Sequence, residues 1–186
     1  QHAYAHNQPD KRLVGIVKFK IVSGGQTGVD RAALDWAVVH HIPHGGWCPA
    51  GRNAENGVIP DRYELTEMPD GGGYLQRTEA NVRDSDATLI VSLGSILTGG
   101  SLTTRECACR SHKPWIHIHP ADDWKTRLAR WLRDNEIQIL NVAGPRASHE
   151  PGATVFSNEV LDEILKHHEL SCNLVRSSSD ILESNS

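Results

Sequence analysis

The 186-residue chain lacks the features that mark several large classes of protein. It has no excess of basic residues: 19 Lys and Arg stand against 23 Asp and Glu, so nothing supports non-specific nucleic-acid binding. No hydrophobic run is long enough to cross a membrane, and residues 1–11 are polar, without the apolar core of a signal peptide. We therefore expect a cytoplasmic protein that binds neither nucleic acid nor membranes.

Motifs of common catalytic and metal centres are also missing. The chain has no G-x-S-x-G sequence of a serine hydrolase, no Walker A lysine and no H-E-x-x-H zinc motif. Its four cysteines show no C-x-x-C spacing, so we expect reduced thiols. Its 11 histidines show no ligand spacing, and we predict no protein-bound metal.

The chain does contain a regular alternation of short apolar segments and amphipathic segments. Strands are expected at residues 16–22, 44–48, 87–93, 115–119 and 137–142. Helices are expected at residues 29–40, 78–83, 101–111, 122–134 and 153–167. This alternation predicts an α/β sandwich of three layers, with a mostly parallel sheet between helices. We assign residues 1–170 to one domain; residues 171–186, with six serines, are expected to form a flexible tail.

Three turns rich in glycine and hydroxyl residues follow predicted strands. They lie at residues 23–28 (SGGQTG), 95–101 (SILTGGS) and 141–146 (NVAGPR). In a parallel sheet all strand-to-helix turns lie at the carboxyl edge, so these turns should converge on one crevice lined with backbone N–H groups. Such a crevice suits an anion, most often a phosphate. The sequence therefore predicts a phosphate-bearing ligand.

The first turn does not follow the G-x-G-x-x-G pattern of dinucleotide-binding proteins. Gly24 and Gly25 would let the backbone approach a ligand closely, while Gln26 and Thr27 would add side-chain hydrogen bonds. The alternative is that both glycines only permit a tight turn. Thr27 and Asp30 have the spacing of a capping box for the helix that follows.

The middle turn is followed by Arg105 and Glu106. Arg105 is placed to pair with a phosphate, and Glu106 to orient a ribose or to act as an acid or base. Thr103 and Glu106 also have the spacing of a capping box, which needs no ligand. For Glu106 considered alone, we favour the capping role.

The last turn and the long polar segment 49–73 complete the expected site. Asn141 ends the last strand, and Arg146 and Ser148 follow in a loop at the same edge as the other turns. Segment 49–73 is rich in Gly, Pro, Asn and Asp, and we expect an irregular loop that forms a wall or lid with Arg52.

Taken in order, several segments resemble the molybdenum-cofactor carrier proteins, a Rossmann-like family. The resemblance runs through SGGQTGVDRAALDWA, PAGRNAENGVIPDRY, RTEANVRDSDATLIVS, LTGGSLTT and NVAGPRASHEPG, and spans about residues 21–165. It implies a protein that binds, protects and carries or stores molybdenum cofactor, a pterin dithiolene with a terminal phosphate, without transforming it. It also implies a homo-oligomer, a dimer or tetramer, whose partners are molybdoenzymes or cofactor-synthesis proteins.

The chemistry of this ligand fits the predicted crevice. Its phosphate and molybdate oxygens would suit the N–H-lined turns and nearby arginines, and the pterin edge would meet Asn, Gln and Thr side chains. Free molybdate or tungstate is a further candidate ligand. A protein thiol could also bind molybdenum directly, and Cys48 is the cysteine nearest a predicted strand end. The residues that we assign to cofactor binding are Gly24, Gly25, Gln26, Thr27, Asp30, Arg31, Arg52, Thr98, Gly99, Gly100, Ser101, Thr104, Arg105, Asn141, Gly144, Pro145, Arg146 and Ser148.

Two other functions stay open at this point. The same superfamily includes nucleotide-sensing domains and phosphoribohydrolases that release cytokinin bases, with the signature P-G-G-x-G-T-x-x-E. Two glycines, Thr103 and Glu106 match that signature, but Thr98 replaces the proline and Leu102 the third glycine. A nucleoside 5′-monophosphate phosphoribohydrolase would use Glu106 and Arg105 for catalysis. A sensor would perform no chemistry.

Overall fold

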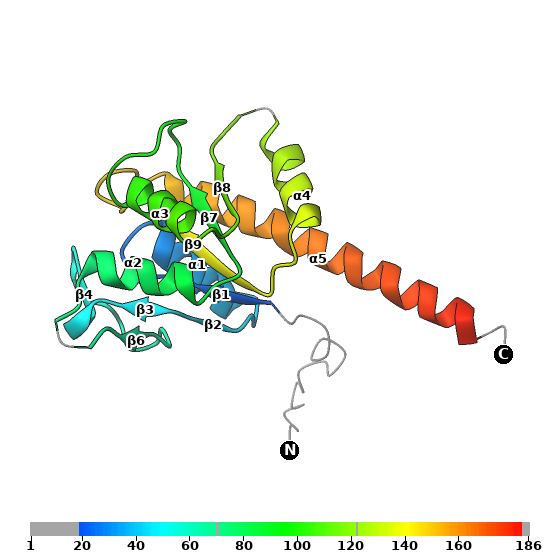
Figure 1. Ribbon diagram of the computed structural model, residues 1–186, viewed down its shortest axis with the longest axis horizontal. Helices are drawn as coiled ribbons and strands as arrows, with labels where there is room; N and C mark the ends of the chain where they lie inside the picture. The colour runs from blue at the N-terminus through cyan, green and yellow to red at the C-terminus, as the bar shows by residue number, and fades with distance from the viewer. Residues whose placement is uncertain (1–18, 70, 122, 184–186) are drawn as a thin grey trace, which may run out of the picture.

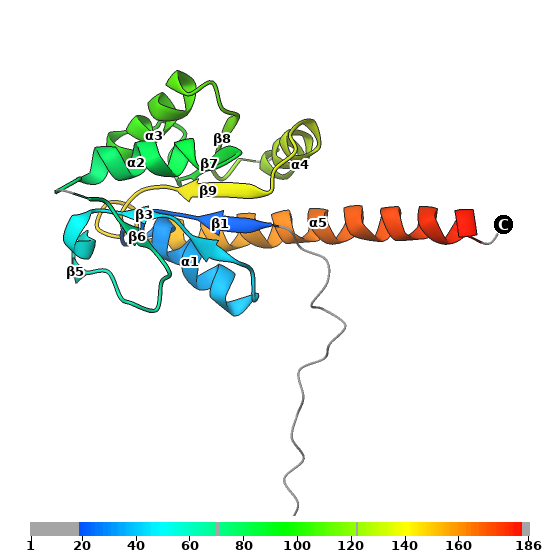
Figure 2. The same cartoon turned by 60° about the horizontal axis from the view of Figure 1, so that its bottom comes forward.

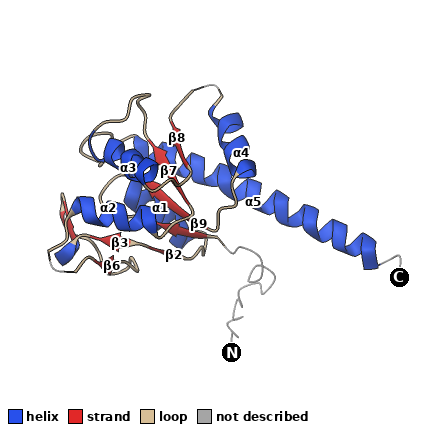
Figure 3. Cartoon of the chain, viewed as in Figure 1, coloured by secondary structure: helices blue, strands red, loops and turns tan. Residues whose placement is uncertain are grey.

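A computed structural model of the chain describes residues 19–69, 71–121 and 123–183. Its centre is a five-stranded sheet in the order β2-β1-β9-β7-β8, in which every neighbouring pair is parallel. The strands of this sheet are β1 (Lys20–Val22), β2 (His44–Gly45), β7 (Ala87–Val91), β8 (Trp115–Ile118) and β9 (Ile139–Ala143). The helices are α1 (Val29–Val39), α2 (Tyr74–Arg83), α3 (Gly99–Arg110), α4 (Trp124–Asp134) and α5 (Ala153–Glu183). Helices flank the sheet (Figures 1 and 3), which confirms the predicted Rossmann-like α/β sandwich.

The two faces of the sheet are covered by different helices. Helices α1 and α5 lie on one side of β1 and β9, and α2 and α3 lie on the other (Figure 2). The main core joins the sheet to α1, α4 and α5, and its fully buried members include Ile21, Val29, Leu89, Leu140 and Leu161. A smaller cluster of Val82, Cys107 and Ala108 joins α2 to α3. Burial of each such large apolar side chain stabilises the fold by about 1.5–3 kcal/mol.

The predicted strand at residues 44–48 is divided by Gly46. This glycine has φ +125°, and a Cβ there would lie 2.4 Å from the carbonyl oxygen of Ser23. Only glycine fits such a close approach at positive φ. The chain therefore leaves the main sheet, and β3 (Trp47–Cys48) pairs instead with β6 (Thr66–Glu67).

The long segment 49–73 has more regular structure than expected. It contains the 3₁₀ helix η2 (Ala50–Arg52) and an antiparallel hairpin of β4 (Asn53–Ala54) and β5 (Gly57–Val58). The guanidinium group of Arg52 holds the loop by donating hydrogen bonds to the backbone carbonyls of Ile59, Pro60, Tyr63 and Leu65. Because these carbonyls occupy its donors, Arg52 has a structural role in this loop.

The last helix is longer than expected. Helix α5 continues through residues 171–183, and its C-terminal part projects beyond the sheet (Figures 1 and 2). The division into one domain and a flexible tail at residues 171–186 stays a prediction. Residues 16–18 of the first predicted strand and 184–186 of the tail lie outside the described residues. No helix in the described ranges is both long and apolar enough to span a membrane.

Candidate functional site

The turns after β1, β7 and β9 meet at one pocket of about 490 Å³, which we call the central pocket. The first turn contributes Gln26, the middle turn residues 96–100, and the last turn residues 144–146. The start of α2 closes the remaining side. Helix α1 connects β1 to β2 at one edge of the sheet, and α3 connects β7 to β8 at the opposite edge. The pocket therefore lies between two chain connections that run in opposite directions from the middle of the sheet, the usual position of a ligand site in such a fold. The predicted convergence of the three turns is confirmed.

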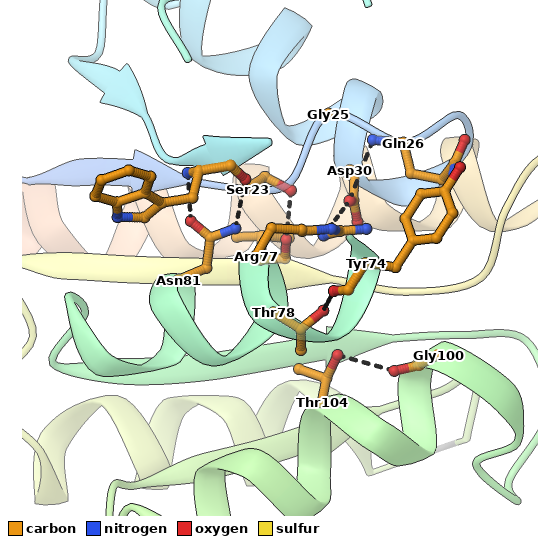
Figure 4. A network of polar contacts seen from close by, with 12 residues as sticks. Ser23, Gly25, Gln26, Asp30, Tyr74, Arg77, Thr78, Asn81, Gly100 and Thr104 are labelled. Carbon is orange, nitrogen blue, oxygen red and sulfur yellow. Dashed lines mark hydrogen bonds and ion pairs between the residues drawn. The ribbon is translucent and has the colours of Figure 1, made fainter. Parts of the chain in front are cut away.

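The middle turn presents an uncovered helix N-terminus to the central pocket. Thr98 is the N-cap of α3, and Gly99 and Gly100 are its first helical residues. A Cβ at either glycine would meet no atom within 4 Å, so no protein group covers the backbone there. The first N–H groups of a helix lack intrahelical partners and favour an anion. Ser101 and Thr104 also line the pocket, and the Thr104 hydroxyl donates to the Gly100 carbonyl at 2.9 Å (Figure 4).

The glycines of the first and last turns pack against the protein itself. A Cβ on Gly24 would lie 1.6 Å from Nη1 of Arg77, and one on Gly144 would lie 2.4 Å from the carbonyl oxygen of Val91. Gly25 has φ +76°, and a Cβ there would lie 2.6 Å from a side-chain carbon of the long loop. These glycines allow close packing, which is the alternative that the sequence left open.

The amide of Gln26 is fixed in one orientation inside the central pocket. Its side-chain Oε1 accepts hydrogen bonds from the backbone N–H groups of Thr27 and Glu55, both at 3.0 Å. Because two N–H donors identify the oxygen, the other end of the amide is Nε2. Gln26 is 4% exposed, and Nε2 has no hydrogen-bond partner among the described residues. An unsatisfied buried donor costs about 1–3 kcal/mol, so an acceptor atom on a ligand would be favourable here.

A buried ion pair connects α2 to the first turn. Nη1 of Arg77 lies 3.1 Å from Oδ2 of Asp30, and both residues line the central pocket (Figure 4). The side chains of Arg77 and Asp30 are 13% and 4% exposed. Burial raises the pKa of Asp30 above its ordinary value, and the charge of Arg77 opposes that rise. Nε of Arg77 is buried without a hydrogen-bond partner in the described part of the chain.

The predicted capping box of α1 is wrong. Gly28, with φ +83°, is the N-cap, and no side chain caps the helix. A Cβ at Gly28 would lie 2.3 Å from the carbonyl oxygen of Pro145, so the approach of the last turn requires glycine at this position. Asp30 instead accepts the N–H of Gln26 at 3.3 Å, inside the first turn.

The last turn places a cation beside an aromatic ring at the central pocket. The guanidinium carbon of Arg146 lies 5.0 Å from the centre of the Tyr74 ring, within the range of a cation–π interaction. Glu150 also lines the pocket, and its carboxylate accepts the N–H of Leu93 at 2.7 Å. Sequence reasoning missed the contributions of Tyr74 and Glu150, because each depends on a contact between distant segments.

Thr27 and Ser148, both predicted to bind the ligand, are instead held by Glu55. The carboxylate of Glu55 accepts hydrogen bonds from the hydroxyl of Thr27 and, at 2.5 Å, from the hydroxyl of Ser148. Hydrogen bonds from Ser148 and then Thr27 lower the pKa of Glu55 below its ordinary value. Through these hydrogen bonds, Glu55 attaches the β4–β5 hairpin to the first and last turns.

Arg31 and Asn141 also lie outside the lining of the central pocket. Arg31 donates to the carbonyl oxygen of Gly25 at 3.1 Å and to the side chain of Asn56 at 3.0 Å. Asn141 is buried and donates to the hydroxyl of Thr88 at 3.2 Å, which joins β9 to β7. Both side chains therefore support the frame of the site.

Arg105 and Glu106 also lie outside the central pocket. Helix α3 begins at Gly99, so its N-cap is Thr98, and the predicted capping box of Thr103 and Glu106 is wrong. Glu106 is exposed and does not line the pocket. The hydrolase alternative, which relies on this carboxylate, therefore gains no support from the geometry.

Cys48 does not reach the central pocket. It is fully buried in a cluster with Leu34, Ile59 and Tyr63, and burial raises the pKa of its thiol. A thiol in this position is not available to a ligand in the pocket. Across residues 19–69, 71–121 and 123–183, no group of three or more His, Cys, Asp and Glu side chains could hold a metal ion.

Comparisons with known proteins agree with the fold and its turns. Residues 21–165 match the model of the circularly permutated YpsA SLOG family. The crystal structure described as "Putative molybdenum carrier protein" from Syntrophus aciditrophicus SB is similar, with 49% sequence identity and a TM-score of 0.74. That match covers 78% of this chain and 94% of the other. A search of curated proteins gives no match. The chain belongs to the circularly permutated YpsA SLOG family.

Proposed function

We propose that this protein binds molybdenum cofactor in the central pocket and carries or stores it without chemical change. The description of the Syntrophus relative as a molybdenum carrier supports this choice of ligand. The observation that carries the proposal is the open backbone at Gly99 and Gly100, which leaves the N-terminus of α3 free to receive the terminal phosphate. In contrast, protein atoms cover Gly24, Gly25, Gly28 and Gly144 of the first and last turns.

The other groups of the central pocket suit the rest of the ligand. Arg146 supplies a positive charge to the pocket, and Nε2 of Gln26 would donate to an oxygen or nitrogen of the pterin edge. Tyr74, Leu75 and Ile96 line the pocket and are substantially exposed, so they offer apolar surface to a flat ring. This arrangement supports a ligand that is anionic at one end and aromatic at the other.

The carboxylates of the central pocket already have protein partners, and this also supports a role in binding. Asp30 is paired with Arg77, and Glu150 accepts the backbone N–H of Leu93. A general base needs a carboxylate within reach of the proton that it removes. Both carboxylates already have protein partners, which favours the carrier over the hydrolase.

Two arginines provide a matched test of the proposed site. Arg146→Ala should weaken the binding of purified cofactor by about tenfold to a hundredfold, the usual effect of losing a charged hydrogen-bonding group. Arg130→Ala removes the same charge at an exposed position on α4, outside the lining of the central pocket, and should leave the affinity unchanged. Anaerobic titration calorimetry measures both. Equal losses in the two variants, or no loss in Arg146→Ala, would contradict the assignment.

The proposal extends to partners that the resemblance implies. We propose a homo-oligomer in the cytoplasm that passes its cargo to molybdoenzymes or receives it from cofactor-synthesis proteins. Sedimentation velocity of the purified protein tests the oligomer, and a monomer at micromolar concentration would contradict it. Titration with molybdate and tungstate tests whether a free oxyanion binds alone.

A further inference from the structure

A second pocket of about 550 Å³ lies along β8 and the loop that follows it, and we call it the basic pocket. It shares Ile96 and Leu97 of the middle turn with the central pocket, so these two residues stand between the two spaces. Basic side chains line it from α3, from β8, from the loop after β8 and from α4. They are Arg105, His117, His119 and Arg127.

The charges of the basic pocket are not balanced by the residues that form it. No carboxylate is among the described residues that line it, and all four basic residues are partly buried. Arg127 donates from Nη2 to the carbonyl oxygen of His117 at 3.0 Å, which holds its guanidinium against β8. The side chain of Arg105 makes no hydrogen bond or ion pair with any described residue. The charge of Arg105 therefore has no protein counter-charge and is available to a bound anion.

Burial and the neighbouring positive charges keep His117 neutral. Burial, His119 and Arg127 together lower the pKa of His117 to about 4, so its ring is neutral near pH 7. Nε2 of His117 lies 2.6 Å from the hydroxyl oxygen of Ser92, and that hydroxyl donates to the carbonyl of Gly94. The permanent charges at the basic pocket are therefore those of Arg105 and Arg127.

We propose that the basic pocket is a second anion site that binds a phosphoryl group. Two guanidinium groups match the oxygens of a phosphate in charge and in hydrogen-bonding geometry. The phosphoryl group has two sources: a separate phosphate ion, or a second phosphate on the ligand of the central pocket. The second source requires a ligand whose phosphate continues into a pyrophosphate-linked nucleotide and passes Ile96 and Leu97. The site itself does not depend on the function proposed above.

The first experiment uses inorganic phosphate and pyrophosphate as probes of the full-length protein. NMR of the histidine rings should show a rise in the pKa of His117 when an anion binds beside it. Arg105→Ala should weaken this response at least about tenfold without unfolding the protein, because Arg105 makes no hydrogen bond or ion pair with a described residue. Arg130→Ala, at an exposed position on α4, is the matched control and should leave the response unchanged. An unaltered histidine pKa at saturating pyrophosphate, or equal affinity in Arg105→Ala, would overturn the proposal.

The second experiment separates the two sources of the phosphoryl group. It compares cofactor that ends in a monophosphate with cofactor extended by a nucleotide, each titrated into wild type and Arg105→Ala. If one ligand spans both pockets, Arg105→Ala weakens only the extended form, by about tenfold or more. If both forms bind equally in both proteins while inorganic phosphate still raises the pKa of His117, a separate ion is the source. If neither form binds but inorganic phosphate raises the pKa of His117, the proposed function fails and the basic pocket stands.

Discussion

Gly24 and Gly100 show how single glycines contribute differently to the central pocket. The guanidinium group of Arg77 occupies the space that a Cβ on Gly24 would need. A Cβ added to Gly100 would have no such protein atom within 4 Å. The first glycine therefore permits the buried ion pair between α2 and α1. The second leaves the start of α3 accessible to a ligand. This difference leads to opposite expectations for the same substitution.

Gly100→Ala should reduce binding without reducing stability. Gly100 does not have positive φ, so alanine fits the backbone and should leave the free energy of unfolding unchanged or about 1 kcal/mol higher. Its methyl group would occupy the space that we assign to phosphate, and the affinity for cofactor should fall at least about tenfold. Gly73→Ala, at the start of α2 and outside the pocket lining, is the control. Thermal unfolding and calorimetry measure the two quantities; unchanged affinity would argue against phosphate at this turn.

His117 should make the stability of the protein depend on pH. Its pKa is about 4 in the folded protein and near 6.5 when unfolded, so the unfolded chain binds more protons between these values. The free energy of unfolding should therefore fall as the pH falls from about 6.5 to about 4, and this group should add no further change below that range. The basic groups that line the same pocket are Arg105, His119 and Arg127.

Urea denaturation at pH 7 and pH 5 checks this expectation. Wild type should lose more stability between the two pH values than His117→Gln, which has no ring to protonate. All other titrating groups are common to both proteins, so the difference isolates this ring. The same loss in both would show that His117 is protonated normally in the folded state.

At the scale of elements, Arg52 organises the loop between β3 and α2. Its guanidinium donates to four backbone carbonyls, and a salt bridge of 3.6 Å to Asp61 adds to them. Buried carbonyls without donors each cost about 1–3 kcal/mol. The order of the loop therefore depends on one side chain, and the hairpin that carries Glu55 depends on the loop.

Arg52→Ala should loosen this loop and lower stability by about 2 kcal/mol or more, because its carbonyls lose their donors. Arg52→Lys should fail to rescue it, since an ammonium group cannot reproduce the planar fork of a guanidinium. Limited proteolysis should show faster cleavage within residues 49–65 in both variants. A loop that stays resistant in Arg52→Ala would contradict the structural role.

The elements were predictable where one segment of sequence determines them. The apolar run at residues 87–93 and the apolar face of residues 122–134 predicted β7 and α4, with ends within a few residues. From the sequence, Arg52 and Arg31 were predicted to bind an anion. Their guanidinium groups instead donate to a carbonyl or an amide oxygen of a distant segment, which no local pattern indicates. Glu55 likewise meets Ser148 across 93 positions of sequence. Contacts of that range depend on the whole fold.

At the scale of the whole molecule, the sheet order determines where the ligand sites lie. Because β9 lies between β1 and β7, the three glycine-rich turns meet at one pocket, and β8 places the basic pocket next to it. Parallel alternation made the common edge predictable, as three turns at the carboxyl ends must share it. The sequence did not indicate the basic pocket, since Arg105 and Arg127 come from helices that meet only through β8.

The most direct test of the central claim is the binding of purified molybdenum cofactor to the full-length protein, with AMP as the comparison ligand. Recovered cofactor is then assayed for its ability to reconstitute an apo-molybdoenzyme. We expect tight, saturable binding, full recovery of active cofactor and no release of adenine from AMP. Absence of cofactor binding, together with release of adenine or another base from a nucleoside monophosphate, would contradict the carrier function and favour the hydrolase.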